Sequence, residues 1–178
     1  DVCSSDLNLK ERRANLPEDK KKNIITASLQ EFSTKGYHRA STNTITNTAG
    51  ISKGLLFHYF GSKKKLYIWL VDYCLEFGQQ WFRKKKLTLS SDLVERALEI
   101  DLLRLEYFHQ HQLISLFLAH AFKDVPPELQ NEMAERIKDR SAEGWKPFFG
   151  DVDMGLFRDD IDRNKAIEML MIIMDGLR

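Results

Sequence analysis

Apolar residues recur along most of the chain at spacings of three and four positions, which is the period of an amphipathic α-helix. The first clear stretch places them at i, i+4 and i+7: Ile25, Leu29 and Phe32. Pro17 suits the first turn of a helix, and Gly36 suits its stop. The pattern therefore predicts a first helix over residues 17–35.

Two short segments follow this helix. In the first, six of the seven residues from 42 to 48 are Thr or Asn, which are weak helix formers, so tertiary packing must hold the segment in a helix. Ser41 can cap its start, and Ile45, Thr48 and Ala49 share one face.

The second short segment follows a tight turn at Gly50. Ser52 can cap it, and Leu56 and Phe60 lie four positions apart, so they form one apolar edge that is expected to be buried. Two helices joined by a turn of about four residues that contains glycine make a helix-turn-helix. We therefore expect this motif over residues 41–60.

The remainder of the chain predicts only further amphipathic helices, the first of them capped by Ser62. They are expected over residues 63–86, 92–110, 112–123, 127–149 and 163–177, with a loop over 150–162. No segment alternates β-branched and polar residues between turn signals, so no strand is predicted. The predicted fold class is all-α.

Residues 1–16 show no steady period, and they are expected to form a flexible leader. The predicted organisation is then a domain over residues 17–65, which contains the helix-turn-helix, and a second helical domain over residues 66–178.

Charge is divided unevenly between the two halves of the chain. Residues 1–86 contain 16 Lys and Arg against 8 Asp and Glu, whereas the rest contain 11 against 18. A basic half joined to an acidic half suggests that one end meets a polyanion. A lysine-rich face that is merely solvated is the alternative.

Composition and motifs argue against several classes of protein. The longest nearly uncharged apolar run, residues 113–122, is half the ~20 residues that a membrane span needs, so no membrane partner and a cytoplasmic location are expected. Cys3 and Cys74 stand alone without the spacing of a metal site, so neither a metal nor another cofactor is predicted. No nucleophile motif, Walker loop or dinucleotide fingerprint is present, which argues against an enzyme.

The outer side of the second short helix has the chemistry to contact base edges in a major groove. If Leu56 and Phe60 are buried, the side chains that point outward belong to Lys53, Gly54, Leu55 and His58. Lysine and histidine can hydrogen-bond base edges, and leucine suits a thymine methyl group. Asn43 on the preceding helix is expected to point the same way.

Three lysines follow directly, at positions 63–65. Cations at the positive end of a helix are unfavourable by roughly 0.3 to 1 kcal/mol each. A bound phosphate would reverse this, because free N–H groups and lysines together make an anion site. A solvated lysine run is the alternative.

Residues 18–70 contain a set of motifs in a fixed order: Phe32–Tyr37, Ile45, Ala49–Gly54, Leu56–Phe60 and Ser62–Tyr67. Their order and spacing resemble the DNA-binding domain of the TetR family of bacterial transcriptional regulators. The resemblance implies an N-terminal three-helix DNA-binding domain, followed by an antiparallel helical domain for ligand binding and dimerisation. It also implies a homodimer on a palindromic double-stranded DNA operator, most simply a repressor that a small-molecule effector releases.

The resemblance assigns contacts by position. Base contacts would come from Asn43, Lys53, Gly54, Leu55 and His58, and phosphate contacts from Ser41, Thr42, Tyr59, Lys63 and Lys64. Three positions depart from the family pattern and each removes a polar contact. Leu55 replaces a small hydroxyl residue, Phe57 lacks a tyrosine hydroxyl, and Asn43 stands where arginine is frequent.

The sequence of the predicted second domain gives fewer indications of function. Aromatic and histidine residues would line an effector pocket, although ordinary core packing is the alternative for each: Tyr107, Phe108, His111, Phe117, His120, Phe122, Trp145, Phe148 and Phe149. The last helix is apolar nearly all round, so it is expected to meet a second subunit through Ile167, Leu170, Met171 and Met174. A competing hypothesis for the whole chain is an adaptor that uses the same scaffold to bind a protein, or DNA without sequence preference.

Overall fold

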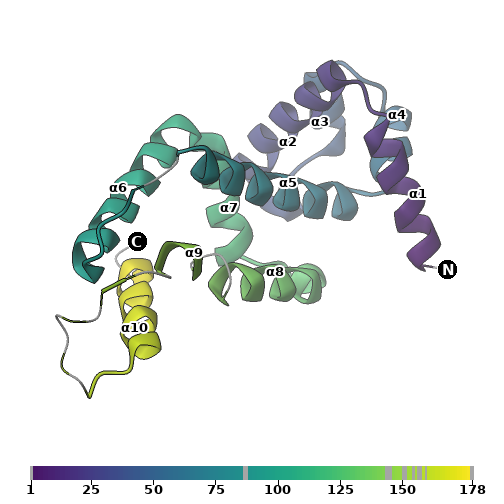
Figure 1. The fold of residues 1–178 in the computed structure, drawn as a ribbon. Helices are drawn as coiled ribbons and strands as arrows, with labels where there is room; N and C mark the ends of the chain where they lie inside the picture. The colour runs from purple at the N-terminus through teal and green to yellow at the C-terminus, as the bar shows by residue number, and fades with distance from the viewer. Residues whose placement is uncertain are drawn as a thin grey trace. The chain divides into compact units, whose positions relative to one another are not determined.

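The computed structural model describes residues 2–85, 88–142, 146–149, 152–153, 155, 158 and 160–176, and every regular element in these ranges is helical (Figure 1). The helices are α1 (Val2–Ala14), α2 (Glu18–Arg39), α3 (Thr42–Ala49), α4 (Lys53–Phe60), α5 (Lys63–Lys84), α6 (Leu93–Gln110), α7 (Gln112–Lys123), η1 (Pro127–Leu129), α8 (Gln130–Ala142), α9 (Lys146–Phe149) and α10 (Arg163–Gly176). The all-α prediction is confirmed.

The chain divides into two compact units. The first unit consists of Asp1–Phe82 and Gln112–Ala134, and the second of Arg83–His111 and Glu135–Arg178. The predicted boundary after residue 65 falls inside the first unit, near the start of α5. The reason is that α7, far along the chain, packs on α2.

Aromatic side chains from three helices form the centre of the first unit. The ring of Phe32 on α2 lies 5.0 Å from that of Tyr67 on α5 and 6.3 Å from that of Phe117 on α7. All three residues are buried, and Cys74 on α5 is fully buried. Large rings bury much apolar area, so they fix these helices against one another.

A helix occupies the segment where a flexible leader was expected, and that expectation is wrong. Helix α1 packs on α4, and it buries Leu9, while Leu16 is buried just beyond its end. Leu16 lies outside the helix, so among the described side chains of α1 only Leu9 marks its buried apolar face. Because so few apolar residues mark that face, the period alone did not reveal the helix.

The other differences are local. Gly36 interrupts α2 with φ 67° and ψ 178°, but one helical turn continues beyond it to Arg39. The single helix predicted over 127–149 is instead η1, α8 and α9, and residues 143–145 lie outside the described ranges. On α3, Thr46 is buried rather than Thr48, and its hydroxyl is satisfied there by donating to the carbonyl of Asn43 at 3.0 Å.

In the second unit, α6 packs against α10. The core there comprises Leu93, Ala97, Ile100, Phe149 and Val152. The buried guanidinium of Arg96 supports it by donating to the carbonyls of Ser90, Leu89 and Phe148, the last at 3.1 Å. None of the described helices has both the length and the apolarity of a membrane span.

Candidate nucleic-acid interface

Helix α3 is held at both ends by local hydrogen bonds. The hydroxyl oxygen of Ser41 accepts from the N–H of Thr44 at 3.4 Å, and Gly50 ends the helix in the left-handed region with φ 66°. The Ser41 cap and the Gly50 turn were both predicted from sequence. Glycine adopts this φ without strain whereas most other residues do not, so the angle between α3 and the next helix depends on Gly50.

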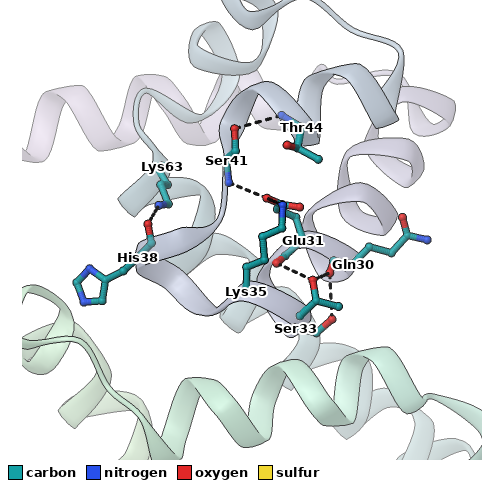
Figure 2. A network of polar contacts seen from close by, with 9 residues as sticks. Gln30, Glu31, Ser33, Lys35, His38, Ser41, Thr44 and Lys63 are labelled. Atoms are coloured by element: carbon teal, nitrogen blue, oxygen red, sulfur yellow. Dashed lines mark hydrogen bonds and ion pairs between the residues drawn. The ribbon is translucent and has the colours of Figure 1, made fainter.

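A buried carboxylate joins α2 to the start of α3. Glu31 accepts from the backbone N–H of Ser41 at 2.8 Å and from the ammonium of Lys35 at 3.0 Å (Figure 2). Burial raises the pKa of Glu31, but these hydrogen bonds and the nearby lysines outweigh it and hold the pKa below its ordinary value. The carboxylate is therefore ionised and fixes α3 on α2.

Sequence reasoning missed Glu31. The available signal was its spacing of four from Lys35, which favours an ion pair on one helix face. That spacing does not reveal that the carboxylate is buried, because burial depends on where α3 crosses α2.

Helix α4 presents the outward face that the sequence predicts. Ser52 caps it by accepting from the N–H of Leu55 at 3.1 Å. Leu56 and Phe60 are only 1% and 0% exposed, and the ring of Phe60 lies 4.8 Å from that of Trp69 on α5. The buried edge predicted for this helix is confirmed.

The opposite side of α4 is open to solvent. Lys53, Gly54 and His58 are exposed, while Leu55 and Tyr59 are half-buried. The rings of His58 and Tyr59 meet edge to face, with centroids 5.1 Å apart. This exposed side of α4 is called the reading face below, and it comprises Lys53, Gly54, Leu55 and His58.

Three more of the residues predicted to contact DNA lie at the start of α3. Asn43 is exposed, whereas Ser41 and Thr42 are half-buried. The backbone N–H of Ser41 donates to Glu31, and its hydroxyl oxygen accepts from the N–H of Thr44. Both polar groups therefore already have partners within the fold.

Lys63 is half-buried, and its ammonium has partners within the first unit. Its ammonium donates to the carbonyl of His38 at 3.0 Å (Figure 2). It also lies 4.9 Å from the centre of the Tyr37 ring. Burial lowers the pKa of Lys63, although the carboxylates of Glu128 and Glu31 favour its charged form.

Lys64 also has partners within the first unit. Its ammonium lies 2.6 Å from the carboxylate of Glu132 and donates to the carbonyl of Glu128 at 2.8 Å. His38 Nδ1 lies 3.5 Å from the Glu128 carboxylate. Acidic residues from η1 and α8 therefore offset the cations at the start of α5. Local sequence spacing does not reveal these acidic partners, because they lie more than sixty positions away.

The predicted pocket residues fall in different units. Phe117 and His120 belong to the first unit, and Phe117 is part of its aromatic core. Tyr107, Phe108, His111 and Phe148 belong to the second unit, where the rings of Tyr107 and His111 lie 5.0 Å apart and Phe108 is exposed. Trp145 lies outside the described ranges. The described residues do not bring this set together within one unit.

The predicted dimer residues lie on α10. Ile167 and Leu170 pack against the core of their own unit beside α6. Met171 and Met174 are in the helix, but their side chains lie outside what the structure describes.

Two short helices that meet at a glycine turn, the second buried along one edge and exposed along the other, define the helix-turn-helix class. Residues 24–68, from α2 into α5, match the family described as "Bacterial regulatory proteins, tetR family". This segment of the chain matches the TetR family, so the resemblance predicted from its motifs is confirmed.

Several curated relatives extend the match. The chain is 31% identical over 139 residues to the HTH-type transcriptional regulator RutR of Escherichia coli O157:H7, which covers 75% of this chain and 65% of the relative. It is 27% identical over 163 residues to the HTH-type transcriptional repressor NicS of Pseudomonas putida, covering 89% and 75%. It is 39% identical over 59 residues to the HTH-type transcriptional activator FasR of Mycolicibacterium smegmatis, covering 32% and 27%.

Proposed function

We propose that this protein is a DNA-binding transcriptional regulator that reads a palindromic operator with the reading face of α4. The observation that supports it is the two-sided exposure of this helix. Leu56 and Phe60 are buried, while Lys53, Gly54 and His58 are open to solvent. Helices of this motif insert their outward side chains into the major groove, where lysine and histidine hydrogen-bond base edges.

For Lys63 and Lys64 to contact phosphates, each must exchange a partner that it has in the structure. The ammonium of Lys64 is paired with Glu132, and that of Lys63 with the carbonyl of His38. About two-fifths of each side chain in the Lys64–Glu132 pair is exposed, so the pair contributes only about 0 to 1 kcal/mol. A DNA phosphate also offers lysine a charge-assisted hydrogen bond, so it can replace such a partner at small cost.

The finer points of the proposal rest on the resemblance of the motifs to the TetR family. We propose a homodimer, because a palindrome needs two reading faces related by a two-fold axis, with half-sites about one helical turn apart. We also propose repression relieved by a small-molecule effector bound in the helices that follow the helix-turn-helix. NicS is named a repressor and FasR an activator, so the sign of regulation is a separate experimental question.

The test is selection of bound sequences from random duplex DNA by the full chain, followed by affinity measurements at several salt concentrations. The expected result is one palindromic motif whose affinity falls steeply with salt. His58→Ala should change the preferred base at one position of each half-site, whereas Lys63→Ala should weaken binding to every duplex and flatten the salt slope.

Equal losses on all sequences for both variants would contradict this division of roles. Capture of a protein partner, with no preferred DNA, would favour the adaptor instead.

A further inference from the structure

Helix α1 packs against the turn that ends α4. The Cδ1 atom of Leu9 lies 3.2 Å from the place where a Cβ on Gly61 would stand, and Leu9 is buried. Gly61 has φ 71°, a conformation that favours glycine. The hollow left by the absent side chain is therefore filled by a leucine from α1.

A second contact reaches the backbone of the helix itself. Nη1 of Arg12 donates to the carbonyl of His58 at 3.2 Å. Carbonyls in the last turn of a helix have no intrahelical partner, and a cation there also interacts favourably with the helix dipole. Arg12 therefore holds the C-terminal end of α4 at the residue whose side chain belongs to the reading face.

We propose that α1 is a positioning element for the reading face, with Arg12 and Leu9 fixing the place of His58. This inference rests on the proposed function. Leu9 and Arg12 lie outside the family match, which begins at residue 24. In this inference they affect sequence preference without contacting DNA. The physical reason is that a base contact depends on the precise position of the side chain, and Leu9 and Arg12 both contact the C-terminal end of α4, close to His58.

A purely electrostatic role for α1 makes a different prediction. Lys10 is exposed on the same helix and has the same charge as Arg12. If α1 acted only by attracting phosphates, removal of either cation would weaken binding to all duplexes alike. If α1 positions His58, then of these two cations only Arg12, which is bonded to the α4 carbonyl, should matter for sequence preference.

The experiment compares the full chain with its Arg12→Ala, Leu9→Ala, Arg12→Lys and Lys10→Ala variants. Each is put through selection from random duplex DNA and through affinity measurement on the wild-type motif. Circular dichroism is used to choose a temperature at which all variants are folded. Arg12→Ala and Leu9→Ala are expected to bind the motif about tenfold more weakly, which corresponds to about 1.4 kcal/mol. They should also lose preference at the base pair that His58→Ala affects.

Arg12→Lys should restore most of the preference, because lysine keeps a charged donor, and Lys10→Ala should keep it fully. The inference is overturned if Arg12→Ala and Lys10→Ala give the same selected motif and the same affinity. It is also overturned if Arg12→Ala weakens every duplex equally. A wild-type chain that selects no motif would instead overturn the proposed function, so the two failures are distinguishable.

Discussion

The two units of this protein bury their apolar residues in different ways. In the first unit, the rings of Phe32, Tyr67 and Phe117 meet at a common centre and are almost wholly buried. In the second unit, α6 buries one face against α10 but leaves large side chains on its other face between 43% and 67% exposed: Val94, Leu98, Leu102, Leu105 and Phe108. The comparison shows that similar helical periodicity can end in a closed core or in an open apolar face.

The largest expected difference between the units comes from truncating one aromatic residue in each. Phe32→Ala should destabilise the first unit by about 3 to 5 kcal/mol, because it removes a buried ring and leaves a cavity. Phe108→Ala is the matched control, and it should cost far less because Phe108 is exposed. Denaturant unfolding followed by circular dichroism measures both. Similar losses would mean that Phe108 is as well packed as Phe32.

A smaller effect is expected at the junction of α2 and α3. Because the folded-state pKa of Glu31 is depressed, its stabilisation is fully present above its ordinary pKa and is lost as pH falls through the folded-state value. Glu31→Gln should therefore cost about 1.5 to 3 kcal/mol at neutral pH, the usual range for a charged hydrogen bond, and progressively less in acid.

Unfolding curves between neutral and acidic pH test this. Glu18→Gln is the control, since Glu18 is on the same helix and its side chain is 86% exposed. A loss for Glu31→Gln that does not change with pH would contradict an ionised carboxylate as the source of stability.

The next effect concerns affinity rather than folding. Glu132→Gln should strengthen binding to every duplex by up to about fivefold, because Lys64 no longer has to leave an ion pair of at most about 1 kcal/mol. Glu135→Gln makes the same charge change at an exposed position of α8 and should have a smaller effect. Affinities measured across a salt series would show the difference, and equal gains for both variants would mean that Lys64 does not contact phosphate.

The smallest effect is expected on the open face of α6. Leu102→Ala should change the free energy of unfolding by less than about 0.5 kcal/mol, because Leu102 is 67% exposed. Ile100→Ala, two positions away and buried, should cost about 2 to 5 kcal/mol. A large loss at Leu102 in the same unfolding assay would show that this face is covered in solution.

Much of the helix-turn-helix could be predicted from sequence because its signals are local. The caps at Ser41, Ser52 and Ser62, the turn at Gly50 and the buried pair on α4 all depend on residues within a few positions of one another. Such contacts are encoded in short spacings that the chain shows directly.

The features that sequence did not predict depend on distant residues. Lys64 meets Glu132, and Phe117 joins Phe32, across more than sixty positions. Helix α1 has too few apolar residues to show a period, although Leu9 finds a place beside Gly61. Helical periodicity says which residues share a face, but it does not say which other face they meet.

The burial of Cys74 at the centre of α5 has a practical consequence. Burial raises the pKa of its thiol to about 12, so almost none of it is thiolate near neutral pH. An alkylating reagent should therefore modify Cys74 only when the surrounding helices separate. The rate of modification at this residue, followed by mass spectrometry of its peptide, would report how often the interior opens without any engineered label.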